Sequence, residues 1–346
     1  MFSFRASRRA ALLRAAVTLS VLAIAPVLTS ASAWAQEFTM KIGFTTINDP
    51  FHEFAKRYAE EVQKRSDNRI KVEIFPAGQL GTAARQIEGL QFGTQEMFIS
   101  PPGFLAGINP GFQAVDAPGQ FKSMDHAHAV VTDPEFQEIY LNQAAEAGIR
   151  GVALWIYGPT AITSVKPIEN IESVKGFKTR VLASPMEQKL AAALGMTGVS
   201  MDFTEALPAL QTGTIDAVRT SLVVMGGMKF FDTAKYAIKE ETGMIFSGAW
   251  VSQSWLDQLP ADLKAIVIDT AHEMQDEGTK ISKDFAAKSD KQWTDAGVTL
   301  VVLSDQERAD LFAKVSPIGD EMLSTNERAA PAWNALKKAL AKAPAN

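Results

Sequence analysis

Few side chains in this sequence have the type and spacing that catalysis requires. The chain has four histidines and no cysteine, which excludes disulfides, cysteine metal ligands and cysteine nucleophiles. His126 and His128 lie two positions apart in an expected helix, where side chains on one face are three or four positions apart, so they predict no metal site. The acidic pairs Glu60–Glu61 and Glu240–Glu241 are adjacent and do not converge on one substrate. No phosphate-binding loop, G-x-S-x-G elbow or H-E-x-x-H motif occurs, so the sequence favours a binding protein without metal or cofactor over an enzyme.

Arg180 is the side chain with the clearest binding chemistry. It shares a face with Lys178 in the strand expected over Phe177–Val181. A guanidinium at the end of a strand can bind a carboxylate through two parallel hydrogen bonds. An exposed arginine or an internal ion pair is the alternative.

The elements that must position such a residue alternate between strands and helices. The expected strands are Phe38–Phe44, Ile70–Phe75, a strand from Met97, Gly151–Tyr157, Phe177–Val181, Asp216–Thr220, Tyr236–Glu241 and Ile245–Ser252. Four helices are expected over about Ala83–Gln91, Pro134–Ala147, Pro185–Leu194 and Pro260–Ala296. Three more are expected to begin at Pro50, after Asp202 and after Ser304. Strands separated by helices predict an α/β architecture.

Residues 1–35 predict a secretory signal peptide and not a membrane anchor. A basic segment without acidic residues precedes an apolar run over Ala15–Leu28 and a small-x-small cleavage site at Ala33–Ala35. The apolar run is shorter than the roughly 20 residues that a membrane span needs. We therefore expect cleavage near Ala35 and a periplasmic protein. Loss of the four arginines in this segment moves the formal net charge from −5 to −9, which argues against a nucleic-acid partner.

Two similar segments, 120 positions apart, favour two related lobes. Leu90–Met97 and Leu210–Ala217 each contain a helix end, a glycine, an acidic residue and the start of a strand. Chance recurrence of helix–glycine–strand joints is the alternative. Ligands of open α/β sheets bind beyond the carboxyl ends of the strands. The strand ends near Ser100 and Thr220 are therefore expected to face one shared cleft.

Several further motifs occur in a fixed order along the chain. They are Val174–Val181, Ala193–Gly195, Met201–Glu205 and Ala209–Asp216, with Arg69–Val72, Gln79–Gly81 and Leu259–Pro260 on either side. Together they resemble the solute-binding subunits of TRAP (tripartite ATP-independent periplasmic) transporters, such as the dicarboxylate-binding proteins. The resemblance implies a two-lobed periplasmic binding protein of type II-like fold, with mixed sheets, crossing hinge strands and a long helix that bridges the lobes.

The resemblance also implies how the chain is divided and what it does. It assigns residues 36–157 plus 246–284 to lobe I, and residues 158–245 plus 285–346 to lobe II. It implies that a small organic acid is captured by closure of the hinge. The expected partners are this acid and the membrane permease subunits of a TRAP transporter.

The family pattern further implies the residues of the site. Arg180 matches the main carboxylate partner, and Phe203 matches an aromatic or apolar wall of the cleft. Thr45 and Ser100 match the ends of lobe I strands that face the ligand.

Two positions depart from this pattern. Many relatives have a second arginine where this chain has Thr160, and an asparagine that helps to hold the carboxylate where it has Thr220. A threonine hydroxyl donates one hydrogen bond and supplies no charge. Arg219 is no clear substitute, because strand alternation points it away from Thr220. The site is therefore expected to bind either a monocarboxylate on a single arginine or a less acidic ligand.

The aromatic side chains expected near the cleft favour a partly apolar or aromatic acid. They are Phe44, Phe51, Trp155, Tyr157 and Phe203. Two other functions stay open: a binding protein that serves another permease or a sensor, and an exported enzyme on the same scaffold.

Overall fold

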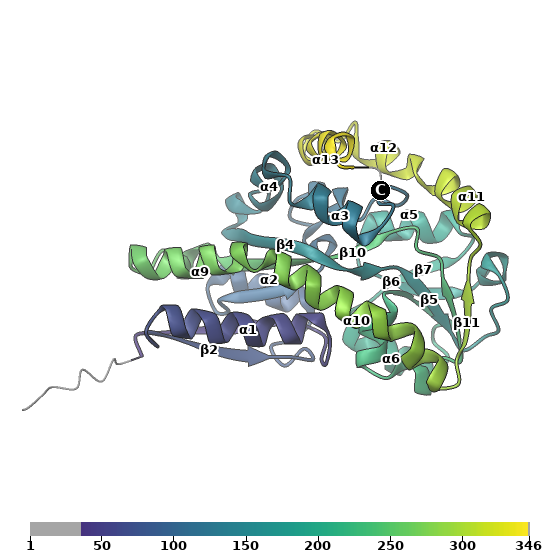
Figure 1. The fold of residues 1–346 in the computed structure, drawn as a ribbon, viewed down its shortest axis with the longest axis horizontal. Helices are drawn as coiled ribbons and strands as arrows, with labels where there is room; N and C mark the ends of the chain where they lie inside the picture. Colours follow the sequence, from purple (N-terminus) through teal and green to yellow (C-terminus); the bar gives the residue numbers. More distant parts are fainter. Residues whose placement is uncertain (1–35, 345–346) are drawn as a thin grey trace, which may run out of the picture. The chain divides into compact units, whose positions relative to one another are not determined.

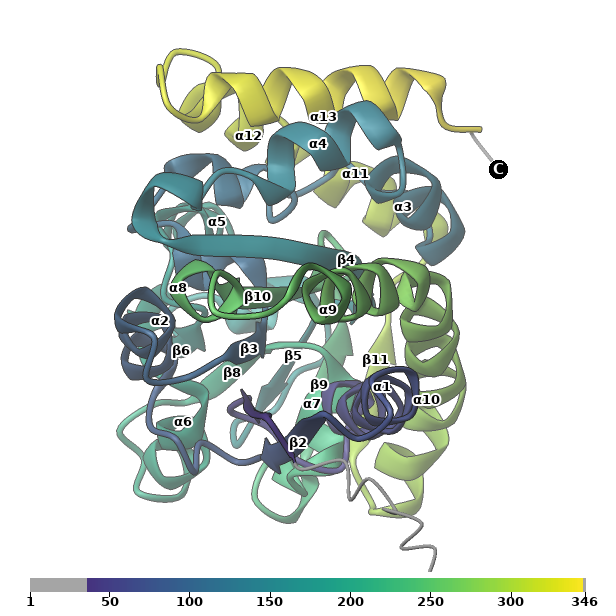
Figure 2. The same cartoon turned by 90° about the vertical axis from the view of Figure 1, so that its left-hand side faces the viewer.

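The computed structural model describes residues 36–344, which form two mixed sheets with helices packed around them (Figures 1 and 2). The predicted signal peptide and its cleavage site near Ala35 lie outside the described residues. The first sheet has the strand order β2-β1-β3-β10-β4, and the second has the order β11-β9-β5-β8-β6-β7. The predicted α/β architecture with mixed sheets is confirmed.

The strands of the first sheet are β1 (Phe38–Gly43), β2 (Ile70–Phe75), β3 (Met97–Ser100), β4 (Ile149–Pro159) and β10 (Met244–Ser252). Those of the second are β5 (Ala161–Ser164), β6 (Lys178–Val181), β7 (Thr197–Ser200), β8 (Ala217–Thr220), β9 (Tyr236–Lys239) and β11 (Thr299–Val302). β1 is parallel to β2 and β3, while β10 runs antiparallel between β3 and β4. β6 is parallel to β7 and β8, and β5 is antiparallel to β8 and β9.

Helices cover both sheets, and those that the sequence predicts begin within one residue of their expected starts, whereas several others were not predicted. They are α1 (Pro50–Arg65), α2 (Ala83–Phe92), α3 (Met124–Val131), α4 (Pro134–Leu141), α5 (Pro185–Ala193), α6 (Phe203–Gln211), α7 (Leu222–Gly227), α8 (Gln253–Leu256), α9 (Ala261–Glu273), α10 (Gln275–Asp295), α11 (Asp305–Val315), α12 (Pro317–Leu323) and α13 (Ala330–Lys342). The 3-10 turns are η1 (Pro102–Leu105), η2 (Pro110–Ala114), η3 (Ala145–Ala147), η4 (Ile171–Val174) and η5 (Phe230–Asp232). Asp49, Asp202 and Ser304 each accept a backbone N–H at the start of α1, α6 and α11, as expected of N-cap side chains.

Two pairs of strands lead the chain from one sheet to the other. β4 of the first sheet continues through Thr160 into β5 of the second, and β9 of the second continues through Glu240–Gly243 into β10 of the first. Thr160 joins the two crossings, because its N–H donates to the carbonyl of Gly243 at 3.1 Å and its carbonyl accepts from Glu241 at 3.1 Å. The crossing segments therefore support each other where the lobes meet.

The helix expected over Pro260–Ala296 is two helices, α9 and α10, with a break at Met274. At the break, the side chain of Gln275 accepts a hydrogen bond from the N–H of Leu154 in β4 at 2.8 Å and donates to the carbonyl of His272 at 3.0 Å. The amide thus connects the end of α9 to the sheet. α10 packs against β4 and α1 on one side and against α7 on the other, so it bridges the two lobes (Figure 1).

Replacement of Gly278 by alanine is expected to lower the free energy of unfolding by about 1–3 kcal/mol, because it overpacks this contact. An added Cβ would lie 2.8 Å from Cδ1 of Trp155, whose ring is fully buried and stacks on Phe54 at 4.1 Å. Urea denaturation measures the change. Gly107→Ala is the matched control, since nothing lies within 4 Å of its added Cβ. Alanine in a helix is by itself about 1 kcal/mol more favourable than glycine, so a Gly278→Ala protein more stable than the wild type would contradict the close approach of α10 to β4.

The hydrophobic core consists of two clusters, and each includes residues from both sheets. One contains Phe98 of β3 and Val181 of β6, and the other contains Phe54 of α1 and Phe203 of α6. The C-terminal segment also contacts both lobes: α12 packs against α5, whereas α13 packs against α3, α4 and η2 (Figure 2). The division predicted from the sequence placed all of residues 285–346 with lobe II, whereas α13 lies on helices assigned to lobe I.

Candidate ligand-binding site

A small cavity lies where strand ends from the two sheets meet. Its lining residues come from both lobes and from the hinge: Thr45, Thr46, Phe51, Pro101, Phe104, Tyr157, Arg180, Leu182, Phe203, Thr220, Val224 and Ile245. Thr45 and Pro101 follow β1 and β3, whereas Leu182 follows β6 and Thr220 ends β8. These are the carboxyl ends of parallel strands, where ligands of α/β sheets bind.

Arg180 is a buried cation whose hydrogen-bonding capacity is not fully used. Its side chain is 1% exposed, and its Nε donates to the carbonyl of Met201 at 3.2 Å. The guanidinium carbon lies 5.2 Å from the ring centre of Phe203. Within residues 36–344, Nη2 has no hydrogen-bond partner. A buried donor without a partner is costly, so this nitrogen favours an anion in the cavity.

The pKa of Arg180 indicates a charge that no nearby carboxylate neutralises. Burial lowers the pKa of its guanidinium to about 10, and the more distant carboxylates of Asp202 and Glu187 only partly oppose this shift. No carboxylate of the described chain forms an ion pair with it. The guanidinium therefore remains charged at neutral pH and is available to a carboxylate from solution.

Four of the six site residues predicted from the sequence line this cavity: Thr45, Arg180, Phe203 and Thr220. Phe203 begins α6 and stacks on Phe230 at 5.4 Å, which fixes the ring that faces Arg180. Thr45 and Thr220 are 3% and 9% exposed, so both hydroxyls are removed from bulk water.

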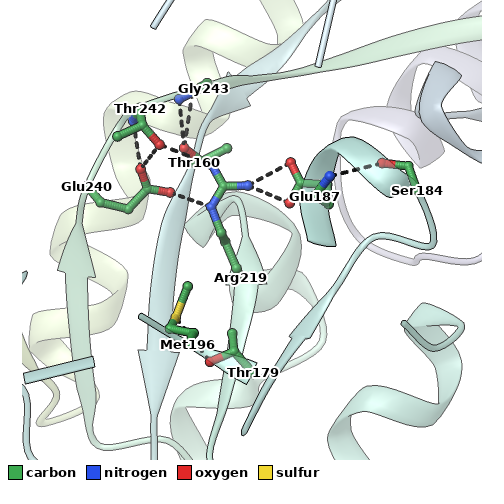
Figure 3. A network of polar contacts seen from close by, with 9 residues as sticks. All are labelled: Thr160, Thr179, Ser184, Glu187, Met196, Arg219, Glu240, Thr242 and Gly243. Atoms are coloured by element: carbon green, nitrogen blue, oxygen red, sulfur yellow. Dashed lines mark hydrogen bonds and ion pairs between the residues drawn. The ribbon is translucent and has the colours of Figure 1, made fainter. Parts of the chain in front are cut away.

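The other two predicted residues, Ser100 and Thr160, are not among the lining residues. The hydroxyl of Ser100 donates to the carbonyl of Pro101 at 3.2 Å. The hydroxyl of Thr160 accepts from the N–H of Gly243 at 3.2 Å and also lies 3.2 Å from the Gly243 carbonyl. Thr160 thus lies in the hinge, where its side chain joins the crossing segments (Figure 3).

Arg219 is the second buried arginine, and it is fully neutralised by carboxylates. Its Nη1 donates to both carboxylate oxygens of Glu187 at 2.8 and 2.6 Å, and its Nε donates to Glu240 at 2.8 Å (Figure 3). Nη2 reaches the hydroxyl of Thr242 at 3.3 Å. Burial alone would lower the pKa of Arg219, but the two glutamates raise it above its ordinary value. Arg219 therefore connects β8 to α5 and to the hinge and is not free for a ligand.

Sequence reasoning missed most of the apolar wall of the cavity. Pro101, Phe104, Leu182, Val224 and Ile245 supply it from four separate segments. Pro101 and Leu182 directly follow strand ends, which is the signal that could have identified them. Tyr157 is fixed in the wall because its hydroxyl donates to the buried carboxylate of Asp49 at 2.8 Å.

The histidine pair has structural contacts. Nδ1 of His126 accepts from the N–H of Lys122 at 3.2 Å, and Nδ1 of His128 lies 3.2 Å from the hydroxyl of Thr279. Across residues 36–344, no cluster of three or more acidic or histidine side chains is arranged to hold a metal ion. In the same part of the chain, no helix is both long and apolar enough to cross a membrane.

Comparisons with known proteins agree with this fold. Residues 43–326 match the family described as bacterial extracellular solute-binding protein, family 7. The C4-dicarboxylate-binding periplasmic protein of Rhodobacter capsulatus is 28% identical over 299 residues, which cover 85% of this chain and 89% of that protein.

Two solved structures are similar over nearly the whole described chain. A TRAP periplasmic solute-binding protein from Desulfovibrio salexigens with bound orotic acid has a TM-score of 0.81 and 27% identity, and the match covers 88% of this chain and 97% of that one. The sugar acid binding protein of Advenella mimigardefordensis in complex with galactonate has a TM-score of 0.80 and 26% identity, with 87% and 98% covered.

The resemblance found in the sequence is thereby confirmed, together with the prediction of a binding protein and not an enzyme. The chain belongs to the bacterial extracellular solute-binding proteins of family 7, the solute-binding subunits of TRAP transporters, which bind small organic acids.

Proposed function

We propose that the protein captures a monocarboxylate with a partly apolar or aromatic body and passes it to the membrane subunits of a TRAP transporter after export to the periplasm. The observation that carries the proposal is the free Nη2 of Arg180 in a cavity where, among the described lining residues, no other side chain is charged. One guanidinium matches one carboxylate, and the two can form a bidentate pair.

The cavity walls argue against a second carboxylate on the ligand. Apart from Arg180, the described lining side chains are threonines, aromatic rings and aliphatic groups. A second ionised group there would lose its hydration without gaining a cation, which is strongly unfavourable. Orotic acid and galactonate, the ligands of the two structural relatives, each have a single carboxylate. A planar or partly apolar acid would also contact Phe51, Phe104 and Phe203.

A thermal-shift panel tests this proposal, because a ligand of the folded state raises the melting temperature. The panel consists of orotate, benzoate, 4-methylpentanoate, galactonate and succinate. We expect at least one monocarboxylate to raise the melting temperature and succinate to have a smaller effect. Native mass spectrometry of protein purified without refolding identifies any acid that is retained. A larger shift with succinate would overturn the monocarboxylate proposal, as would the absence of both a shift and a retained acid.

Replacement of Thr220 by asparagine is expected to tighten the binding of the best monocarboxylate of this panel by about tenfold or more. The amide adds a donor at a position on the cavity wall, and a hydrogen bond to a charged group contributes about 1.5–3 kcal/mol. Thr220→Val has nearly the same volume as threonine and no hydroxyl, so it should weaken binding. Isothermal titration calorimetry measures both variants. Unchanged affinity in both would show that this position does not contact the carboxylate.

A further inference from the structure

Three consecutive residues connect the binding arginine to the opposite lobe. The carbonyl of Met201 accepts from Nε of Arg180 at 3.2 Å, and the ring of Phe203 lies 5.2 Å from the Arg180 guanidinium. Asp202, between them, points its carboxylate toward both lobes. Its Oδ1 accepts from the N–H of Thr204 at 3.0 Å and from the Thr204 hydroxyl at 2.8 Å.

The second oxygen of Asp202 makes a contact across the cleft. Oδ2 accepts from the N–H of Ala83 at 2.8 Å, and Ala83 is the first residue of α2. α2 packs on β3 and β10 of the first sheet, whereas α6 packs on β8 of the second. One carboxylate therefore lies at the N-termini of two helices from different lobes, and both helix dipoles favour its negative charge there.

We propose that Asp202 is a positioning residue that holds the two lobes closed around the ligand. When the lobes separate, the N–H of Ala83 loses this acceptor, and as one of the first N–H groups of α2 it has no acceptor within the helix. Asp202 is next to Met201, whose carbonyl holds the Arg180 guanidinium. The residue that positions the ligand-binding arginine and the residue that contacts the opposite lobe are therefore neighbours in the chain. The identity of the enclosed ligand rests on the proposed function, but the interlobe contact itself does not.

The fit around this contact supports a specific closed arrangement. Gly78 lies opposite Thr204, and a Cβ on Gly78 would be 2.9 Å from Cγ2 of Thr204. At a second interlobe contact, a Cβ on Gly227 would lie 2.8 Å from the carbonyl oxygen of Ile47 and 3.0 Å from that of Asn48. Side chains at either glycine would separate the lobes, so the closed state depends on close approach at two places besides the cavity.

Distances between spin labels on the two lobes test the proposal. The chain has no cysteine, so Phe92→Cys at the exposed end of α2 and Thr214→Cys after α6 provide two unique labelling sites. Pulsed electron spin resonance is measured on protein as purified and on protein unfolded and refolded to remove retained solute. In Asp202→Asn and Asp202→Ser, we expect the ratio of closed to open protein to fall about tenfold. Both substitutes still cap α6, so folding is preserved.

Two further variants make the outcome decisive. Asp133→Asn makes the same substitution at the N-cap of α4, away from the cavity, and should leave the distances unchanged. Gly227→Ala should open the lobes without altering Asp202. The proposal is overturned if Gly227→Ala lowers the fraction of closed protein and Asp202→Asn does not. It is also overturned if the wild type has no closed population in either preparation. Because no acid is added, a failure of the monocarboxylate proposal leaves this test intact.

Discussion

Replacement of Arg180 by alanine is expected to weaken the binding of a monocarboxylate by roughly tenfold to a hundredfold or more. The side chain is buried and its Nη2 is unpartnered within residues 36–344, so a bound carboxylate gains a charge-assisted hydrogen bond worth about 1.5–3 kcal/mol. Arg180→Lys should recover little of this loss, because an ammonium lacks the planar fork that binds both oxygens. Isothermal titration calorimetry with the tightest monocarboxylate of the thermal-shift panel measures the effect.

Lys178→Ala is the matched control for this prediction. It removes a positive charge from the same strand at an exposed position outside the cavity, so affinity should stay within about twofold. Wild-type affinity in the Arg180→Ala protein would refute the assignment of Arg180 to the ligand.

The pH dependence gives a further check on the same group. The pKa of Arg180 is lowered to about 10 by burial, so the guanidinium is protonated well below that pH. A simple carboxylate is ionised above about pH 5. Affinity should therefore be constant between about pH 6 and 9, and it should fall as the pH approaches 10 and the guanidinium loses its proton.

Replacement of Arg219 by methionine is expected to lower the free energy of unfolding by about 3–5 kcal/mol, because it leaves Glu187 and Glu240 buried without their cation. Urea denaturation at neutral pH measures the loss as a lower midpoint. The effect should be much larger than that of Arg180→Ala on the protein without ligand, since Arg180 has no ion pair to lose.

A triple variant separates the lost ion pairs from lost packing. Adding Glu187→Gln and Glu240→Gln to Arg219→Met removes both buried charges and should restore part of the stability. If Arg219→Met unfolds at the wild-type midpoint, the network in Figure 3 contributes nothing to the folded state. If the triple variant is no more stable than Arg219→Met, packing and not charge accounts for the loss.

The contrast between the two arginines shows what a single sequence can and cannot predict. Strand alternation in β8 correctly pointed Arg219 away from Thr220, since that rule depends only on backbone geometry. The ion-pair partners of Arg219 lie 32 and 21 positions away, in α5 and after β9. Only the tertiary fold brings them together, so the sequence could not distinguish the paired arginine from the unpaired one without the family resemblance.

The elements themselves were easier to predict than their interruptions. N-cap residues and glycines locate helix ends through local hydrogen bonds, and for this reason α1, α6 and α11 begin where the sequence indicates. The break at Met274 depends instead on an amide of Gln275 that reaches β4, a contact invisible in helical periodicity. Similarly, Thr160 matched a ligand position in the family pattern, but its hydroxyl is engaged by Gly243.

The position of β10 between β3 and β4 has a consequence for the order in which the chain can fold. β3 pairs with β1 and β10, whereas β10 is the only neighbour of β4 in this sheet, so β10 joins β4 to the other strands. All of β5–β9, which belong to the other sheet, precede β10 in the chain. The first sheet is therefore incomplete until Met244–Ser252 is available, although most of its strands are made first. Pairing between strands far apart in the chain loses loop-closure entropy before the new contacts stabilise the fold. We therefore infer that the two lobes fold together and slowly, and not one after the other.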